Sequence, residues 1–165
     1  MDFESHSFAV AEGAKFSILI PTWNNLPYLK CCVRSLRTHS KFAHQLIVHV
    51  NDGSDGTLDW VRAEQIDHTW TAENVGVCHA LNAAATLAKT DYIAYFNDDM
   101  YALPEWDDYL WQDIVRRKND LWFMSATMIE PRDTGNLCVL APFDFGQDLE
   151  SFRENDLITW LGEHA

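Results

Sequence analysis

Three consecutive polar residues end one of the hydrophobic segments of the chain. Residues 97–99, Asn-Asp-Asp, follow the run Tyr92–Phe96, whose aromatic and β-branched residues predict a short buried strand. Side chains alternate along an extended backbone, so we expect Asn97 and Asp99 to face one way and Asp98 the other. Carboxylate and amide oxygens are ligands that Mg²⁺ and Mn²⁺ prefer, often together with substrate phosphates. The pattern favours a divalent-cation site; a simple polar turn is the alternative.

A second polar segment, Asn51–Thr57, also follows a hydrophobic run and contains two glycines. The carboxylate of Asp52 in this flexible loop is suited to accept a hydrogen bond from a ring N–H or a ribose hydroxyl. The alternative interpretation is a turn-forming Asp that caps the helix beginning at Thr57. Asp52 would contact a ligand in the first interpretation and only the protein backbone in the second.

Five other residues are candidates for ligand contacts. Asn74 and Gly76 begin a segment of helical pattern, where backbone N–H groups either meet a phosphate or are capped in the ordinary way. His79 and Asn82 lie one helical turn apart, so they either point together into a crevice or lie on the surface. Trp23 either stacks on a nucleobase or belongs to the core. Taken singly, each residue leaves both alternatives open.

The segments that carry these residues alternate between strand and helix patterns. Apolar runs predict strands, the first of them ended by Pro21, at Phe16–Ile20, Gln45–Val50, His68–Thr71 and Tyr92–Phe96. Helical spacing predicts helices after the first three strands, over residues 26–36, 58–61 and 77–89, with Asn24 or Asn25 available to cap the first. The alternation predicts an α/β fold with a Rossmann-like, mostly parallel sheet flanked by helices.

The polar loops all lie where predicted strands end. Ligands bind parallel sheets outside the carboxyl ends of the strands. Three segments, Thr22–Asn25, Asn51–Gly56 and Asn97–Asp99, occupy such positions. We therefore expect them to converge on one crevice.

The last third of the chain contains shorter patterns. An amphipathic helix is predicted after Pro104, and a hairpin or turn at Pro131–Gly135 separates apolar runs at Leu121–Ile129 and Leu137–Leu140. Residues 149–161 again have helical spacing. No domain boundary is visible, so a single domain over residues 1–165 is expected.

The charge balance limits the classes of partner. Twelve Lys and Arg against 25 Asp and Glu give a net charge of −13. Such a surface repels phosphate backbones, which argues against nucleic acid as a partner. An anionic phosphate ester would need a cation to mediate its binding.

The cysteines and the chain start bear on the compartment. Four cysteines, without zinc-ligand spacing, predict reduced and buried thiols in a cytosolic protein. The first 15 residues lack the apolar core of a signal peptide, and no segment has the roughly 18 apolar residues of a membrane span. We expect a cytoplasmic protein, peripheral to the inner membrane only through its partners, with monomer and homo-oligomer both open.

Four motifs occur in order and at compact spacing. They are Ser17-Ile-Leu-Ile-Pro-Thr-Trp-Asn-Asn25, Val50-Asn-Asp-Gly-Ser-Asp-Gly-Thr57, Glu73-Asn-Val-Gly76 with Leu81-Asn-Ala-Ala84, and Tyr92-Ile-Ala-Tyr-Phe-Asn-Asp-Asp99. Together they resemble the family 2 glycosyltransferases with a GT-A fold, over about residues 16–110. The resemblance implies a nucleotide-sugar donor (a UDP-, GDP- or dTDP-sugar), Mn²⁺ or Mg²⁺, and inverting transfer to a hydroxyl of a saccharide or lipid-linked acceptor.

The resemblance also implies roles for individual residues. The implied metal ligands are Asn97 and Asp99, and the implied donor-binding residues are Thr22, Trp23, Asn24, Asn51, Asp52, Asn74, Gly76, Asn82 and Asp98. Two positions depart from the family's pattern, because Asn51 and Asn97 each stand where the family has the first Asp of a motif. A neutral first ligand weakens the attraction for a cation, so metal binding is expected to depend on the diphosphate.

The catalytic base is not identified by these motifs. In the family it comes from the carboxyl-terminal part, together with the acceptor site, and we expect that part to be incomplete in this chain. Late carboxylates, among them Glu154 and Asp156 as candidates for the base, occur at Asp148, Glu150, Glu154 and Asp156. Their spacing is also that of a solvated helix face.

Two other functions remain as alternatives to a complete glycosyltransferase. A catalytically incomplete nucleotide-sugar-binding module would bind the donor without turnover. A nucleotidyltransferase would need a glycine- and basic-rich phosphate loop after the first strand, and Pro21–Asn25 has neither feature.

Overall fold

The computed structural model describes residues 2–119 and 121–164. The chain divides into two compact units, Met1–Asp108 and Tyr109–Ala165. These units are defined by packing alone, so the expectation of one domain over residues 1–165 stays a prediction.

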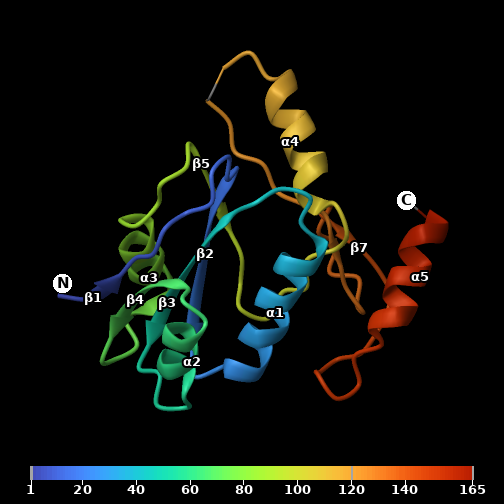
Figure 1. The fold of residues 1–165 in the computed structure, drawn as a ribbon. Coiled ribbons are helices and arrows are strands. Elements are labelled where there is room, and N and C mark those ends of the chain that lie inside the picture. The colour runs from blue at the N-terminus through green and yellow to red at the C-terminus, as the bar shows by residue number, and fades with distance from the viewer. Residues whose placement is uncertain (1, 120, 165) are drawn as a thin grey trace. The chain divides into compact units, whose positions relative to one another are not determined.

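The first unit is a layered α/β structure (Figure 1). In chain order it contains β1 (Glu4–His6), β2 (Phe16–Trp23), α1 (Leu26–His39), β3 (Gln45–Asn51), α2 (Thr57–Ala63), β4 (Asp67–Thr71), α3 (Gly76–Ala85), β5 (Tyr92–Tyr95) and the start of α4 (Trp106–Arg116). The strand order is β1-β4-β3-β2-β5. The four strands from β2 to β5 are parallel, and only β1 is antiparallel to its neighbour. The predicted α/β fold with a mostly parallel sheet is confirmed.

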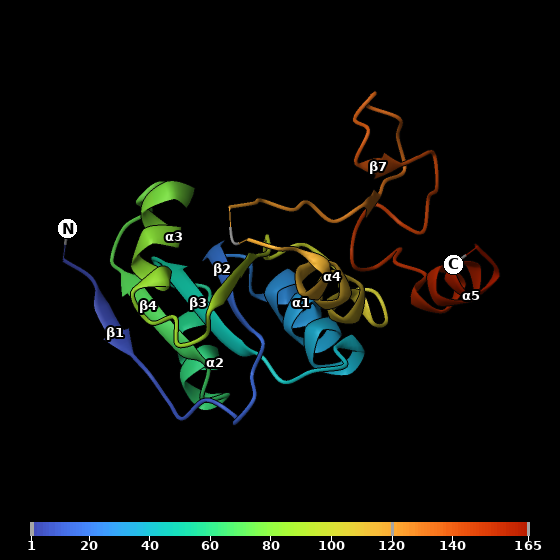
Figure 2. The ribbon, with the colours of Figure 1, turned by 90° about the horizontal axis from the view of Figure 1, so that it is seen from above.

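Helices cover both faces of this sheet, as the view from above shows (Figure 2). Helices α1 and α2 lie on one face and α3 on the other. This follows from right-handed crossovers, because the chain moves outward from β2 to β4 and then returns to place β5 on the other side of β2. The strand order therefore reverses between β2 and β5, which is where ligands bind in open α/β sheets.

The core of the first unit is centred on β2 and β3. Residues 16–20 are all buried, because a strand covered on both faces needs apolar side chains in both directions. Leu19, Ile47 and Ala84 form one cluster between the sheet and α3. The small alanines of α3 let that helix approach the sheet closely.

Pro21 does not end the first strand, contrary to the prediction. Strand β2 continues to Trp23 alongside β3, so Thr22 and Trp23 are strand residues rather than loop residues. Leu19 accepts a hydrogen bond from the Phe96 N–H on the β5 side, and pairing with β5 stops there. Pro21 lies two residues further on and faces the same way, so its missing N–H has no strand to bond.

Strand β5 is not buried as predicted. It is an edge strand among the described residues, and Ile93 and Tyr95 are 54% and 49% exposed. The aromatic and β-branched run correctly indicated a strand, but composition does not tell a central strand from an edge strand.

Helix α3 is also shorter than predicted, ending at Ala85 instead of Lys89. The Thr86 hydroxyl donates to the Ala83 carbonyl, and the Thr86 N–H bonds to the same oxygen. The Lys89 N–H is bonded by side chains of the sheet, Ser17 and Gln45, instead of by a helical carbonyl. These contacts end the helix one turn early.

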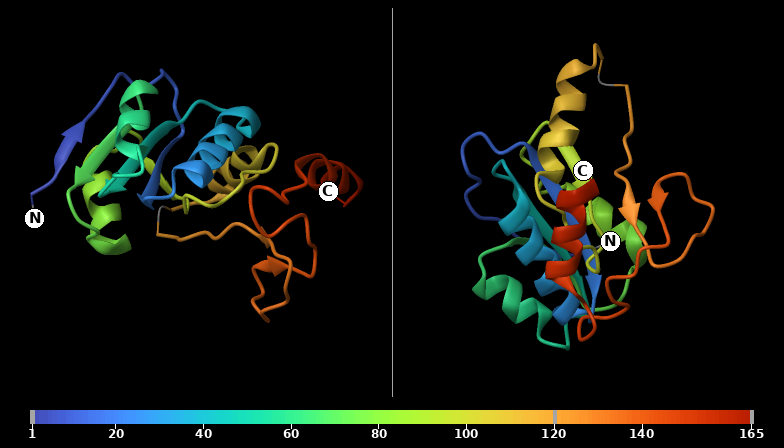
Figure 3. Two further views of the ribbon diagram at one scale, coloured as in Figure 1. Left: turned by 90° about the horizontal axis from the view of Figure 1, so that it is seen from below. Right: turned by 90° about the vertical axis from the view of Figure 1, so that its right-hand side faces the viewer.

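The second unit contains most of α4, a pair of two-residue strands and a final helix (Figure 3). Strands β6 (Met128–Ile129) and β7 (Val139–Leu140) are parallel, so of the two alternatives predicted for Pro131–Gly135, a hairpin or a turn, the hairpin is wrong. In the apolar run Leu121–Ile129, Leu121 and Phe123 are each 94% exposed. Helix α5 (Glu154–His164) begins later than its apolar spacing suggested.

The cysteines and helices answer two further expectations. All four thiols are free, as predicted, but only Cys32 is buried, and Cys78 and Cys138 are exposed. Among the residues described, no helix is long and apolar enough to cross a bilayer.

Candidate functional site

The polar loops converge at the carboxyl edge of the sheet, as expected. The Thr22 hydroxyl at the end of β2 donates to the Asp98 carboxylate after β5, at 2.6 Å. This bond spans the point where the strand order reverses. The Asn24 amide donates to the Asp52 carboxylate at 2.8 Å and so joins the loops after β2 and β3. Three loops far apart in the sequence therefore form one edge.

The segment after β5 turns instead of continuing as a strand, since β5 ends at Tyr95. Asp98 is half-buried and directed at Thr22, whereas Asn97 and Asp99 are exposed. The Tyr95 hydroxyl donates to the Asn97 side-chain oxygen. The predicted division therefore holds, with Asp98 facing inward and the two implied metal ligands facing solvent, although a turn produces it.

Burial raises the pKa of Asp98 above its usual value, and the neighbouring charge of Asp99 adds to the increase. Hydrogen bonds from the Thr22 hydroxyl and the Asn25 side chain oppose it without cancelling it. The pKa of Tyr95 is also raised, first by burial and then by the charges of Asp99 and Asp98. In the turn after β5, the charges of Asp98 and Asp99 therefore add to the burial that raises the pKa of Tyr95.

The loop after β3 is held by side chains on both sides. Asp52 has a positive φ of 63°, and its carboxylate accepts bonds from Asn24 and from the Ser54 hydroxyl. The Asn24 side-chain oxygen in turn accepts the Gly53 N–H. Side-chain hydrogen bonds therefore hold Asp52 and its loop in place, and Asp52 does not cap the following helix.

The cap of both neighbouring helices is Asp55, which the sequence analysis missed. Its carboxylate accepts the Leu26 N–H at the start of α1 and the Thr57 N–H at the start of α2. Neither predicted cap residue bonds the start of α1 with its side chain, although Asn25 occupies the cap position. The Asp-Gly-Thr sequence was the available signal, because Asp two residues before a helix start commonly bonds that N–H.

Asn51 is buried beneath the edge, at 4% exposure. Its amide donates to the Thr22 carbonyl at 3.0 Å, and its oxygen accepts the Val75 N–H at 2.9 Å. Both polar atoms of the side chain are thus bonded within the chain.

The start of α3 and Trp23 complete the set of sequence-predicted residues. Asn74 accepts the Gly76 N–H, and Gly76 has a positive φ of 78°. His79 and Asn82 are exposed on α3. Trp23 is 58% exposed at the end of β2, so it is not a core residue.

The sequence model of glycosyl transferase family 2 matches residues 17–137, which include every loop of this edge. The chain belongs to glycosyl transferase family 2. No curated protein matches the chain. Two crystal structures, of S. aureus TarS 1–349 and of S. aureus TarS, superpose with a TM-score of 0.51 at 21% and 20% identity.

The TarS structures support the fold of the family 2 chain. Each match covers 61% of this chain, but only 31% and 19% of the two TarS chains. The chain thus spans less than a third of the length of either structure. At this level of identity the likeness shows only that the elements are arranged in the same way.

The oxygens at the edge of this family 2 chain are of the chemical type that a divalent cation uses. Among residues 2–119 and 121–164, no group of three or more His, Cys, Asp or Glu side chains has the geometry of a metal site. Asn97 and Asp99 are exposed neighbours with oxygen ligands. Two protein oxygens are what Mg²⁺ uses when phosphates and water supply the rest of its octahedron.

The late carboxylates all lie in the second unit, and the local partners of Asp148 and Asp156 are seen directly. Asp148 accepts the Ser151 N–H and hydroxyl, which lowers the Asp148 pKa. Asp156 pairs with Arg153 at 3.3 Å. A catalytic role for Glu154 or Asp156 stays a prediction.

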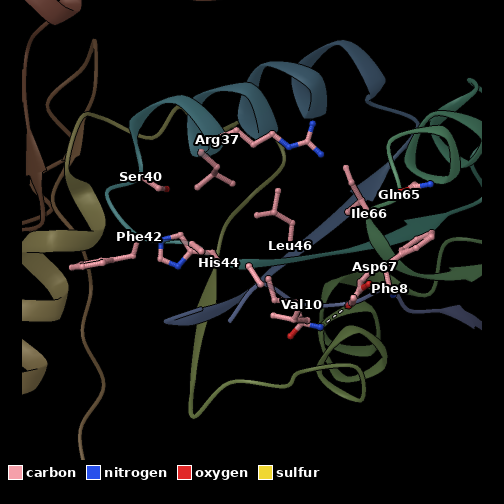
Figure 4. Close-up of a pocket in the computed structure, with 15 residues that line it drawn as sticks. Phe8, Val10, Arg37, Ser40, Phe42, His44, Leu46, Gln65, Ile66 and Asp67 are labelled. Carbon is pink, nitrogen blue, oxygen red and sulfur yellow. Dashed lines mark hydrogen bonds between the residues drawn. The ribbon is translucent and has the colours of Figure 1, made fainter. Parts of the chain in front are cut away.

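A cavity of about 390 Å³ lies at the opposite, amino end of the sheet (Figure 4). None of the sequence-predicted site residues lines it. The carboxylate of Asp67 at its wall accepts bonds from the Phe8 N–H and the Gln45 amide. The acidic side chain of this cavity is thus already bonded within the protein.

Proposed function

We propose that the chain is the donor-binding part of an inverting glycosyltransferase that uses a nucleotide-diphosphate sugar and Mn²⁺ or Mg²⁺. The observation that carries this proposal is the Thr22–Asp98 hydrogen bond across the point of strand reversal. It joins the loop after β2 to the acidic turn after β5, and the Asn24–Asp52 bond adds the loop after β3. These bonds make one continuous edge, at which a nucleotide and its phosphates would meet the acidic turn after β5.

The charge at this edge supports the need for a cation. The site residues include the carboxylates of Asp52, Asp98 and Asp99 and no Lys or Arg. A diphosphate close to these groups is repelled unless a cation lies between them. Asn97 and Asp99 would hold that cation, which when bound neutralises the charge that develops on the leaving diphosphate.

The protein's own residues would do the positioning. Asp52, which is hydrogen-bonded by Asn24 and Ser54, would accept a hydrogen bond from the nucleoside, and the exposed Trp23 would stack on the base. The acceptor would be a hydroxyl of a saccharide or a lipid-linked sugar, deprotonated by a carboxylate for which Glu154 and Asp156 are the candidates. A UDP-, GDP- or dTDP-sugar is the donor class.

The test is a binding titration with UDP, GDP, CDP and dTDP, each with Mn²⁺ and with excess chelator. We expect one nucleotide to bind, with affinity falling at least about tenfold in chelator and in Asp99→Ala, because the diphosphate then meets uncompensated carboxylates. Asp113→Ala is the matched control, since it removes another exposed carboxylate, which lies outside the site.

Two results would count against the proposal. The first is no binding of any of the four nucleotides, and the second is binding that neither chelator nor Asp99→Ala weakens. A catalytically incomplete binding module predicts the same titration but no transfer to any acceptor. Asp148 and Asp156 favour this alternative to the extent that both are engaged in local bonds.

A further inference from the structure

We propose that Asn51 is a positioning residue that fixes the donor site from below without contacting the donor. The inference rests on the proposed function for its ligand, but its geometry is independent of it. Asn51 is the last residue of β3 and stands where the family's loop begins with Asp. Its departure from that pattern has a physical reason in this chain.

Asn51 connects three segments of the edge through one side chain. Its amide N–H₂ bonds the Thr22 carbonyl at the end of β2, and its oxygen bonds the Val75 N–H before α3. It belongs itself to the strand that leads into Asp52. The ends of β2 and β3 and the start of α3 are therefore held at fixed distances.

The bond to Thr22 reaches the acidic corner. Asn51 holds the carbonyl of Thr22, and the hydroxyl of Thr22 holds the Asp98 carboxylate at 2.6 Å. A shift of the Thr22 backbone would therefore move the partner of Asp98. In the other direction, the Val75 bond sets the position of Asn74 and Gly76 at the start of α3.

A second buried side chain of β3 supports the same loop. His49 lies two residues before Asn51, hence on the same face of the strand, and its Nε2 is 3.3 Å from the Thr71 hydroxyl. That hydroxyl donates to the Glu73 carbonyl. The loop between β4 and α3 is thus fastened at Glu73 and at Val75.

Only a side chain with both a donor and an acceptor satisfies these partners. Aspartate has the same shape, but when ionised it only accepts hydrogen bonds. It would keep the Val75 bond, lose the Thr22 bond and place a negative charge against a carbonyl oxygen at a buried position. Burial would raise the pKa of the introduced carboxyl, and the protonated form would donate to Thr22 again.

The experiment compares the binding of UDP with Mn²⁺, or of whichever of the four diphosphates the wild type selects, at pH 7.5 and pH 5.5. We expect Asn51→Asp to bind at least tenfold more weakly than the wild type at pH 7.5 and to recover most of that loss at pH 5.5. Asn51→Ala, which has no proton to regain, should be at least tenfold weaker at both. Expressing each affinity relative to the wild type at the same pH removes the contribution of Asp98. His49 faces the same position, because it hydrogen-bonds to Asn51, although burial lowers its pKa to about 4 in the wild type. Repeating the comparison in a His49→Gln background separates the titration of the introduced carboxyl from that of His49, and the same recovery at pH 5.5 is expected there.

The matched control is Asn136→Asp, because the exposed Asn136 only accepts the Cys138 N–H, which Asp also does. Thermal unfolding of each variant at both pH values shows whether it is folded. If Asn51→Asp does not fold at pH 7.5, Asn51→Ala decides. Wild-type affinity in a folded Asn51→Ala variant, or an Asn51→Asp deficit that is the same at both pH values, overturns the proposal.

A second readout separates this inference from the proposed function. Amide hydrogen exchange at Val75, without nucleotide, should be at least tenfold faster in Asn51→Ala, while the Ile66 amide, bonded to Val61, keeps its rate. If the wild type binds no nucleotide but this exchange accelerates, the proposed function fails and the positioning role of Asn51 stands. Unchanged exchange at Val75 overturns the positioning role itself.

Discussion

Aspartates lie at both ends of the parallel sheet, but their surroundings differ. At the amino end, Asp107 is fully buried and accepts the Lys41 N–H, the Phe42 N–H and the His44 ring nitrogen. At the carboxyl end, Asp98 is half-buried and Asp99 is exposed, with no basic residue in the site. The same side chain stabilises the fold at one end and remains open to a ligand at the other.

The difference lies in which groups surround each carboxylate. Backbone N–H groups and a histidine compensate Asp107, so its burial costs little and its removal would leave three unpaired groups. Asp98 has a hydroxyl and an amide as partners and an anion, Asp99, as a neighbour, and its pKa is raised. A carboxylate whose charged form is destabilised by its surroundings is stabilised when a cation binds next to it. Ligand binding is therefore expected at the carboxyl end of the sheet.

The largest effect should come from the amino end. Asp107→Ala should lower the free energy of unfolding by about 3–5 kcal/mol, because it leaves the Lys41 and Phe42 N–H groups and the His44 ring buried without an acceptor. Urea unfolding measures the change. The exposed Asp113→Ala should change stability by less than about 0.5 kcal/mol. An equally small change in Asp107→Ala would remove the distinction between the two ends.

An intermediate effect is expected from His49, in the interior between the two ends. Burial lowers its pKa from 6.5 to about 4, so the unfolded chain takes up a proton that the folded chain does not. The stability contributed by neutral His49 is complete above pH 6.5 and is lost as the pH falls toward 4, by about 3 kcal/mol. Urea unfolding at several pH values should show this slope, and His49→Gln should flatten it. A slope that persists unchanged in the variant would contradict the assignment.

The smallest effect, and the one of opposite sign, is expected at the carboxyl end. Asp98→Asn keeps an oxygen for the Thr22 hydroxyl and removes a partly buried charge next to Asp99. The free energy of unfolding at pH 7 should stay the same or rise by up to about 1 kcal/mol. The gain should shrink as the pH falls, because the raised pKa lets the wild-type carboxyl become neutral in the folded state first. A clear loss of stability at pH 7 would mean that Asp98 serves the fold.

Much of the site could be predicted because its residues follow strands. Thr22, Asp52 and Asp98 each lie two residues after the end of an apolar run, and parallel strands bring such positions to one edge. The edge position of β5 could not be predicted, since an apolar run indicates a strand but not its neighbours. The cap at Asp55 was missed because one carboxylate serves two helices whose starts are 31 residues apart in the sequence, Leu26 and Thr57.

The sequence by itself determined the α/β fold, the order of the four motifs and the family, because periodicity and motif spacing are local properties of the chain. Only the tertiary structure decided which polar side chains remain available to a ligand and which are hydrogen-bonded inside the protein. Asn51 and Asp52 are adjacent and similar in the sequence, yet Asn51 is buried with both polar atoms bonded and Asp52 is only partly buried, on the loop after β3. The reason is that β3 ends between them: Asn51 is still a strand residue packed against Thr22 and Val75, whereas the chain turns away at Asp52, which has a φ of 63°.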